Sequence, residues 1–203
     1  MANNKKNIVE STIKNKNNKI KEADITFNLQ TNIDNSIDFT INMNVLIEPA
    51  MRPRTALDGR IYDPLATYKK IIEKQLKKFL NDNNFNIIED AYITTELYLY
   101  LEPCKSLSKM ERLLAYQGLI RPTKKPDVDN CEKTIFDILN DTLYKDDSQI
   151  VSSTTEKHYD LEEKTYFKAH IVPKQKITER FNIKMIDEIK NKSLREKIKG
   201  KMG

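Results

Sequence analysis

The sequence predicts an α+β fold, in which helices pack on a single mixed β-sheet. Residues 37–47 and 93–101 alternate apolar and polar side chains, the pattern of half-buried strands. Between them, apolar residues recur at helical spacing over residues 65–79, directly after Pro64, and another helical stripe begins at Cys131. This mixed order of strands and helices favours one sheet with helices packed against it.

The remaining elements follow from local sequence signals. Residues 106–116 predict a short helix that ends before Gly118. Residues 150–159 and 164–172 read as two strands, and we expect them to pair as a β-hairpin. Pro173 ends this hairpin because proline has no N–H to donate to a neighbouring strand.

Composition divides the chain into three parts. Residues 1–35 form a basic extension rich in Asn and Lys, residues 36–173 form the folded domain, and residues 174–203 form a second basic extension. Within the last part, residues 177–202 have enough spaced apolar side chains for a basic amphipathic helix. That helix could lie on the domain, on a second subunit or on DNA.

Charge is distributed unevenly along the 203 residues. The formal net charge is +5, but residues 1–22 carry +4 and residues 174–203 carry +6, which leaves −5 on residues 23–173. Overall basicity is therefore weak support for DNA contact by the domain itself. With 38% hydrophobic residues, the chain can form one domain with a sizeable core.

The sequence favours a cytoplasmic protein with no membrane partner and no organic cofactor. Cys104 and Cys131 form no C-x-x-C pair, so we expect neither a disulfide framework nor a zinc ribbon. His158 and His170 lack metal-ligand spacing and fit strand positions instead. The first residues include no long apolar segment of the kind that directs secretion or crosses a bilayer.

Four acidic residues mark the ends of the helix that contains Cys131: Asp127 and Asp129 before it, Asp146 and Asp147 after it. Carboxylates gathered in one place repel and shift one another's pKa unless a positive group compensates them. In an extended segment residues i and i+2 point to the same side, so Asp127 and Asp129 could face one point, and Asn130 could cap the helix.

The rest of this segment predicts how the acidic residues could be brought together. Lys133 comes four residues after Asp129, about one helical turn, which would place its ammonium beside the same point. The apolar stripe indicates that the helix ends near Leu143, and the following loop could return Asp146 and Asp147 to the site.

Oxygen ligands of this kind suit Mg²⁺ and metal-assisted hydrolysis of a phosphodiester. Spacing alone leaves another interpretation open, in which Asp127 and Asp129 are ordinary helix-capping residues and Asp146 and Asp147 belong to a turn. A helix-loop-helix calcium site is excluded, because Glu132 stands where that loop requires Gly.

Residues 125–141 and 144–150, KPDVDNCEKTIFDILND and YKDDSQI, resemble the signature of the RusA family of Holliday junction resolvases. The family motif has a D-x-D-N segment, a Lys three residues after the Asn, an Asp-bearing helix and a D-D-S/A-Q turn. Residues 49–64, residues 104–126 and the pair Glu156–Lys157 also resemble members of this family from Gram-positive bacteria and their phages. The similarity covers roughly residues 37–172.

The resemblance implies a crossover-junction endodeoxyribonuclease of DNA recombination and repair, with the RusA-like build of helices on one sheet. It implies that Asp127, Asp129 and Asp147 are catalytic metal ligands, with Asp146 as a further candidate, and that Lys133 is the catalytic lysine. The expected cofactor is Mg²⁺, for which Mn²⁺ can substitute. A homodimer is also implied, and two active sites related by a twofold axis would explain symmetric incisions across a junction.

Two basic segments are candidates for gripping the DNA backbone, because a polyanion needs positive neighbours to approach an acidic site. One segment includes Arg52, Arg54 and Arg60, and the other includes Lys105, Lys109, Arg112, Arg121, Lys124 and Lys125. By contrast, the lysines of the first helix fit a solvated face: Lys69, Lys70, Lys74, Lys77 and Lys78.

Two alternative functions stay open from the sequence. A catalytically silent DNA-binding protein would keep the basic segments without cutting, and an Mg²⁺-dependent nuclease could act on flaps or other branched DNA instead of four-way junctions.

Overall fold

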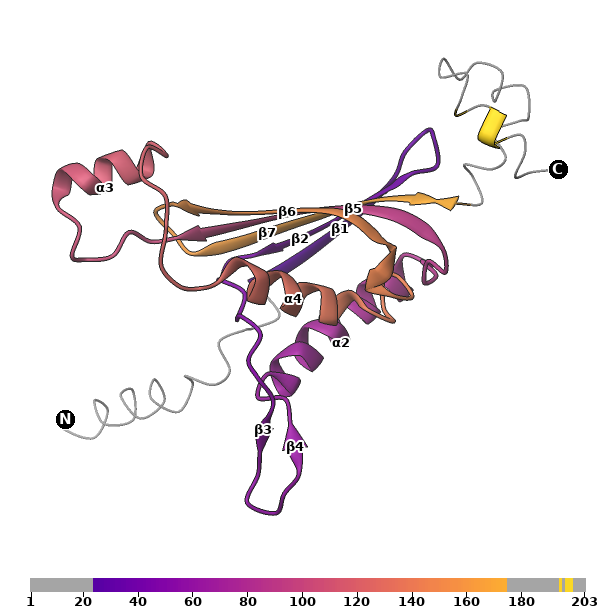
Figure 1. The fold of residues 1–203 in the computed structure, drawn as a ribbon, viewed down its shortest axis with the longest axis horizontal. Helices are drawn as coiled ribbons and strands as arrows, with labels where there is room; N and C mark the ends of the chain where they lie inside the picture. The colour runs from indigo at the N-terminus through magenta and orange to yellow at the C-terminus, as the bar shows by residue number, and fades with distance from the viewer. Residues whose placement is uncertain (1–23, 175–193, 195, 199–203) are drawn as a thin grey trace, which may run out of the picture.

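The computed structural model describes residues 24–174, 194 and 196–198. Within them a five-stranded sheet is covered on one face by two helices, which confirms the predicted α+β class (Figure 1). The strands are β1 (Ile25–Thr31), β2 (Ile37–Met43), β3 (Arg54–Thr55), β4 (Ile61–Tyr62), β5 (Ala91–Leu101), β6 (Ile150–Tyr159) and β7 (Lys164–Pro173). The helices are α2 (Ala66–Asp82), α3 (Lys109–Tyr116), α4 (Val128–Leu139) and the 3-10 helix η3 (Asp147–Gln149).

The sheet is mixed, with the spatial order β1-β2-β7-β5-β6. Neighbouring strands run antiparallel except β5 and β6, which are parallel and pair from Ile93 with Ile150 to Leu101 with Tyr159. A parallel pair requires a crossover connection, and here the crossover contains α3 and α4. The crossover therefore places α4 against the face of the sheet.

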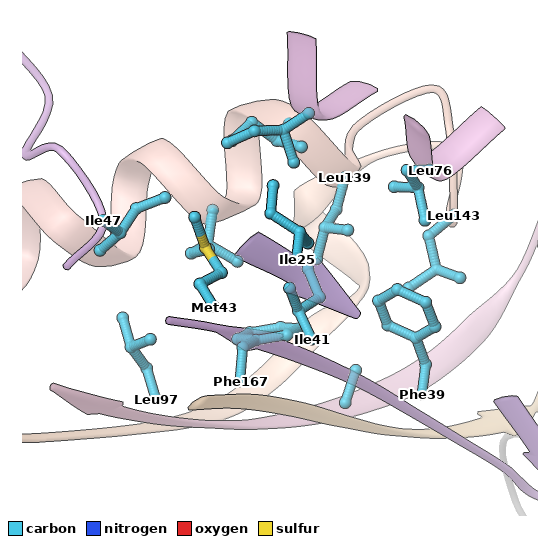
Figure 2. Packing of buried hydrophobic residues seen from close by; sticks show 14 of the residues in the cluster. Ile25, Phe39, Ile41, Met43, Ile47, Leu76, Leu97, Leu139, Leu143 and Phe167 are labelled. Atoms are coloured by element: carbon cyan, nitrogen blue, oxygen red, sulfur yellow. The ribbon is translucent and has the colours of Figure 1, made fainter. Parts of the chain in front are cut away.

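The core lies between the sheet and the helices α2 and α4 (Figure 1). Strand residues at alternate positions, such as Phe39 and Phe167, point toward the helices, where Leu76 of α2 and Leu139 of α4 meet them (Figure 2). Each fully buried side chain of this kind stabilises the folded protein by roughly 1.5–3 kcal/mol. The register of β2, β5 and β7 is fixed in this way, because a slip of one residue would expose every apolar side chain.

A short hairpin, β3–β4, projects from the body of the protein (Figure 1). Its turn contains Gly59 with φ of 82°, a conformation that glycine adopts without steric cost. The sequence predicted only an irregular loop here. The helix α3 also projects, and it begins with a capping box in which Ser108 and Glu111 exchange hydrogen bonds.

The predicted hairpin of residues 150–172 is wrong in its pairing. The two strands form as β6 and β7, but β5 lies between them in the sheet and pairs with both. Short sequence separation favours direct pairing, whereas the long apolar strand β5 is buried only if it has a neighbour on each side.

One strand and one helix end earlier than predicted, and one strand was not predicted. Strand β2 ends at Met43 instead of residue 47. Beyond Met43 the side-chain hydroxyl of Thr165 in β7, and not the main chain of β7, donates to Val45 O at 3.0 Å and accepts from Ile47 N–H at 2.8 Å. Helix α4 ends at Leu139, since the next residue is already extended. Strand β1 was not predicted, and it extends the sheet into the segment assigned to the N-terminal extension.

The helix predicted over residues 177–202 lies almost wholly outside the described residues. In the part of the chain that the structure describes, no helix has the length and apolar character needed to cross a bilayer.

Candidate active site

The first acidic pair lies at the N-terminal end of α4. Asp127 is the N-cap residue, with extended backbone, and Asp129 lies in the first helical turn; both side chains are exposed. The expected extended geometry and the Asn130 cap are therefore wrong, because the helix already begins at Val128. The Asp127 side chain makes no capping hydrogen bond, so both of its oxygens stay available to a ligand.

The segment that follows β2 holds the start of α4 in place. Ala50 donates its N–H to Asn130 O at 2.8 Å, and the Cys131 thiol lies 4.0 Å from Ile47 O. Burial raises the pKa of Cys131 to about 12, so this thiol stays neutral and serves packing. Glu48 is fixed in turn, because its N–H donates to the Tyr68 hydroxyl at 3.0 Å.

A pocket of about 680 Å³ opens beside Asp127, between this segment and the start of α4. The polar and charged residues in its lining are Glu48, Lys125, Asp127, Asn130 and Glu163. Most of the other lining residues are apolar residues of the segment 45–51. Asp127 thus stands next to a space that a substrate phosphate and its metal could enter.

Lys133 is exposed on α4, one turn after Asp129, as the sequence predicted. Lys69 differs from its predicted solvated position, because its side chain is only 13% exposed and contacts Asp63 at 2.8 Å and Asp137 at 2.7 Å. Burial acts to lower the pKa of Lys69, but the hydrogen bonds to the two carboxylates outweigh it and raise the pKa. Lys69 therefore ties α2 to α4.

The second acidic pair lies beyond the other end of α4. Asp146 accepts the Ser148 N–H at 2.8 Å and is the N-cap of η3; hydrogen bonds from Ser148 hold the pKa of Asp146 below its ordinary value. Asp147 is the first residue of η3 and is exposed. Helix α4 has 12 residues, about 18 Å of helix, and separates the two acidic pairs along the chain. Among the residues described, no three His, Cys, Asp or Glu side chains form a group that could hold a metal ion.

The first acidic pair nevertheless fits Mg²⁺ by the chemistry of its donors. Mg²⁺ commonly takes one or two carboxylates and completes its coordination with water and substrate phosphate oxygens. Asp127 and Asp129 are exposed, hard oxygen donors, and Asp127 lines the pocket. Convergence of Asp147 and Asp146 on the same ion stays a prediction.

The two basic segments lie on separate projections of the fold (Figure 1). Arg54 and Arg60 belong to the β3–β4 hairpin and its turn, with Arg52 just before it, and all three are exposed. Arg60 pairs with Asp58 at 2.6 Å, although its side chain is 83% exposed and remains open to a phosphate.

The other basic residues lie on α3 and on the loops beside it: Lys105, Lys109, Arg112, Arg121, Lys124 and Lys125. Lys125 lines the pocket. Arg121 is engaged within the protein, because its guanidinium lies 2.7 Å from His158 Nδ1 and 3.4 Å from Glu156 Oε2. His158 and His170 occupy strand positions, as predicted.

Two further residues lie at this end of α4: Lys157, which the family resemblance included without a role, and Glu132, which sequence reasoning missed. Lys157 of β6 donates to the main chain directly before Asp127, and Glu132 of α4 accepts hydroxyl hydrogen bonds from β6. The spacing of Ser153, Thr155 and Lys157, every second residue of one strand, is the signal that these side chains share a face.

Comparison with known proteins agrees with this architecture. The family model of endodeoxyribonuclease RusA matches residues 47–169. The uncharacterized protein YqaN of Bacillus subtilis (strain 168) is similar, with 32% identity over 124 residues that cover 59% of this chain and 87% of YqaN. The matched segment contains both acidic pairs, Lys133 and the β3–β4 hairpin. The chain belongs to the RusA family of endodeoxyribonucleases.

Proposed function

We propose that this protein is an Mg²⁺-dependent endonuclease that cuts four-way DNA junctions. The observation that carries the proposal is the placement of Asp127 and Asp129 at the fixed end of α4, beside a pocket of about 680 Å³. Membership of an endodeoxyribonuclease family supplies the reaction class. The two basic projections supply positive charge for a DNA backbone on either side of an acidic centre.

Asp127 and Asp129 would hold the metal, which when bound polarises a phosphoryl oxygen and lowers the pKa of a water molecule. Lys133 would face the same substrate phosphate, because it follows Asp129 by one helical turn. Its ammonium would stabilise the negative charge that gathers on the phosphate as the bond to the leaving oxygen breaks. Exposure of all three side chains agrees with direct contact to DNA.

The placement of the acidic pairs supports a site shared by two subunits. Helix α4 separates the two pairs along the chain, and among the described residues no three such side chains of one subunit form a group that could hold a metal ion. In a homodimer with a twofold axis, each subunit can present its first acidic pair to the second acidic pair of its partner, which forms two equivalent sites. Asp147 would then complete the site of the other subunit, and two coupled incisions would follow from the symmetry.

The proposed activity is tested with the Asp129→Asn variant and a panel of four-way junction, flap and linear duplex. We expect wild-type protein to cut the four-way junction in Mg²⁺ or Mn²⁺ and the variant to bind it with equal or higher affinity without cutting. If the protein cuts flaps in preference to four-way junctions, the proposed substrate is wrong and flaps take its place. A wild-type protein that binds all branched DNA and cuts none would be a DNA-binding protein only.

A further inference from the structure

One face of strand β6 contacts the start of α4 through three alternate side chains. Ser153 and Thr155 both donate to Glu132 Oε1, the latter at 2.9 Å. Lys157, two residues farther, reaches the loop before α4. Because alternate residues of a strand point to one side, a single edge strand fixes both the helix and its leading loop.

Lys157 makes the contact nearest to the proposed metal ligands. Its ammonium donates to Lys124 O at 2.6 Å and to Pro126 O at 3.0 Å. The carbonyl carbon of Pro126 is bonded to the nitrogen of Asp127, so the second hydrogen bond holds the peptide plane that leads into the ligand. Charged donors form hydrogen bonds roughly twice as strong as neutral ones.

From this geometry we infer that Lys157 is a positioning residue, which orients Asp127 for metal binding through the main chain of residues 124–126. The inference rests on the proposed function, since it assigns a role toward the metal that Asp127 would hold. Lys157 is distinct from Lys133: it lies on the sheet, and its two contacts are carbonyl oxygens of the protein itself.

The hydrogen bonds of Glu132 attach the helix itself to the same strand. Glu132 lies between Asp129 and Lys133 in sequence, on the side of α4 that faces β6. Its two hydroxyl partners fix the rotation of the first turns, and Thr95 of β5 holds Ser153 in turn at 2.9 Å. Asp129 and Lys133 are exposed, on the side of α4 opposite its buried residues Cys131 and Ile135.

Lys157 could instead act only by its charge, and the two roles predict opposite changes in metal affinity. Loss of a nearby cation strengthens the attraction of the acidic pair for a divalent ion. Loss of a group that orients a metal ligand weakens binding, typically 10–100-fold. A positioning role therefore requires that Lys157→Met bind the ion more weakly, although the variant has one positive charge less.

The test measures Mn²⁺ binding to the full-length protein without DNA, by isothermal titration, for wild type, Lys157→Met and Lys157→Arg. Lys168→Met is the matched control, because Lys168 lies on the opposite face of the sheet beside Asp38, at 3.5 Å. We expect Mn²⁺ affinity to fall roughly 10–100-fold in Lys157→Met, to recover in part in Lys157→Arg and to be unchanged in Lys168→Met. Amide hydrogen exchange over residues 124–130 should accelerate in Lys157→Met alone.

The kinetic result should separate chemistry from binding. In Lys157→Met, kcat for junction cleavage should fall by the same order while junction affinity in the absence of metal changes less than about twofold. Unchanged or tighter Mn²⁺ binding in Lys157→Met overturns the inference, as does an equal loss in Lys168→Met. If wild-type protein cuts no DNA yet shows the expected Mn²⁺ and exchange differences, the proposed function fails and the positioning role stands.

Discussion

The two ends of helix α4 present acidic pairs in very different surroundings. At the N-terminal end, Asp127 and Asp129 stand on a frame in which Ala50 and Lys157 hold the main chain, beside a pocket. At the other end, Asp146 and Asp147 lie on an exposed turn, and the contact of Asp146 is with its neighbour Ser148. Rigid support favours catalysis, so the N-terminal end of α4 is the better-supported half of the proposed site, and the proposed shared site takes its further ligand from the exposed turn.

The largest expected effect concerns the exposed end. If the partner's second acidic pair completes each site, Asp147→Asn should reduce cleavage about as severely as Asp129→Asn, by roughly 10³-fold or more, since each removes a metal ligand. Asp141→Asn is the control, because Asp141 is also exposed at this end of α4 and pairs with Lys145 at 2.6 Å. Single-turnover cleavage of a four-way junction measures the difference. Full activity in Asp147→Asn would limit the site to the N-terminal end.

Lys133→Met should give the next largest effect. Removal of a group that stabilises charge in the transition state lowers kcat by about 10²–10³-fold. Junction affinity should change little if the other basic side chains contact the DNA backbone as proposed. Lys70→Met on the exposed side of α2 serves as the control. A loss confined to affinity, with kcat intact, would make Lys133 a phosphate anchor instead of a catalyst.

Lys69→Met tests the frame that connects α2 to α4. Loss of the partly buried ammonium leaves Asp63 and Asp137 unpaired, and with both carboxylates about one third exposed we expect about 1–2 kcal/mol of destabilisation in urea unfolding.

The pH dependence of that effect has a defined sign. Burial acts to raise the pKa of Asp63, but the hydrogen bonds from Lys69 and the Leu65 N–H and the charge of Lys69 together outweigh it and lower the pKa from 3.8. The stabilisation is therefore complete above the unfolded pKa and is lost as the pH falls below about 4 through the folded value. The difference between wild type and Lys69→Met should shrink over that range, and a difference that persists at pH 3 would contradict the pairing.

The smallest effect is expected at the β3–β4 hairpin. Arg54→Gln should reduce the slope of log K against log salt for junction binding by about one, since each phosphate contact releases roughly one counterion. Arg121→Gln is a useful comparison because Arg121 already contacts His158 and Glu156. An unchanged slope in Arg54→Gln would exclude the hairpin from the DNA interface.

Sequence patterns were informative where burial is periodic. The alternation in β5 and the helical stripe of α2 predicted both elements, because each has one face in the core. The order of the strands could not be predicted in this way. Strand β5 lies between β6 and β7, and this long-range pairing does not follow from the local spacing of residues. The N-terminal strand β1 was missed because its polar outer residues resemble the preceding Asn- and Lys-rich segment.

The sequence motif proposes residues for the candidate site but does not give their geometry. The motif indicates Asp127, Asp129 and Lys133, but an extended D-x-D segment and a helix that begins at Val128 place the same side chains differently. Lys69 shows the same limit, since its lysine-rich helix predicts a solvated face and only the packed fold reveals Asp137 within 2.7 Å. Contacts between elements decide these cases.

The shared active site is tested most directly by mixing two inactive variants. Asp129→Asn and Asp147→Asn proteins are unfolded together, refolded and assayed on a four-way junction, with each variant alone as the control. In a shared arrangement a mixed dimer contains one site with both substitutions and one intact site, so single-strand nicking should return to a substantial fraction of the rate of one wild-type site. If every site were formed within one chain, the mixture would stay as inactive as its parents, and that result would contradict the account.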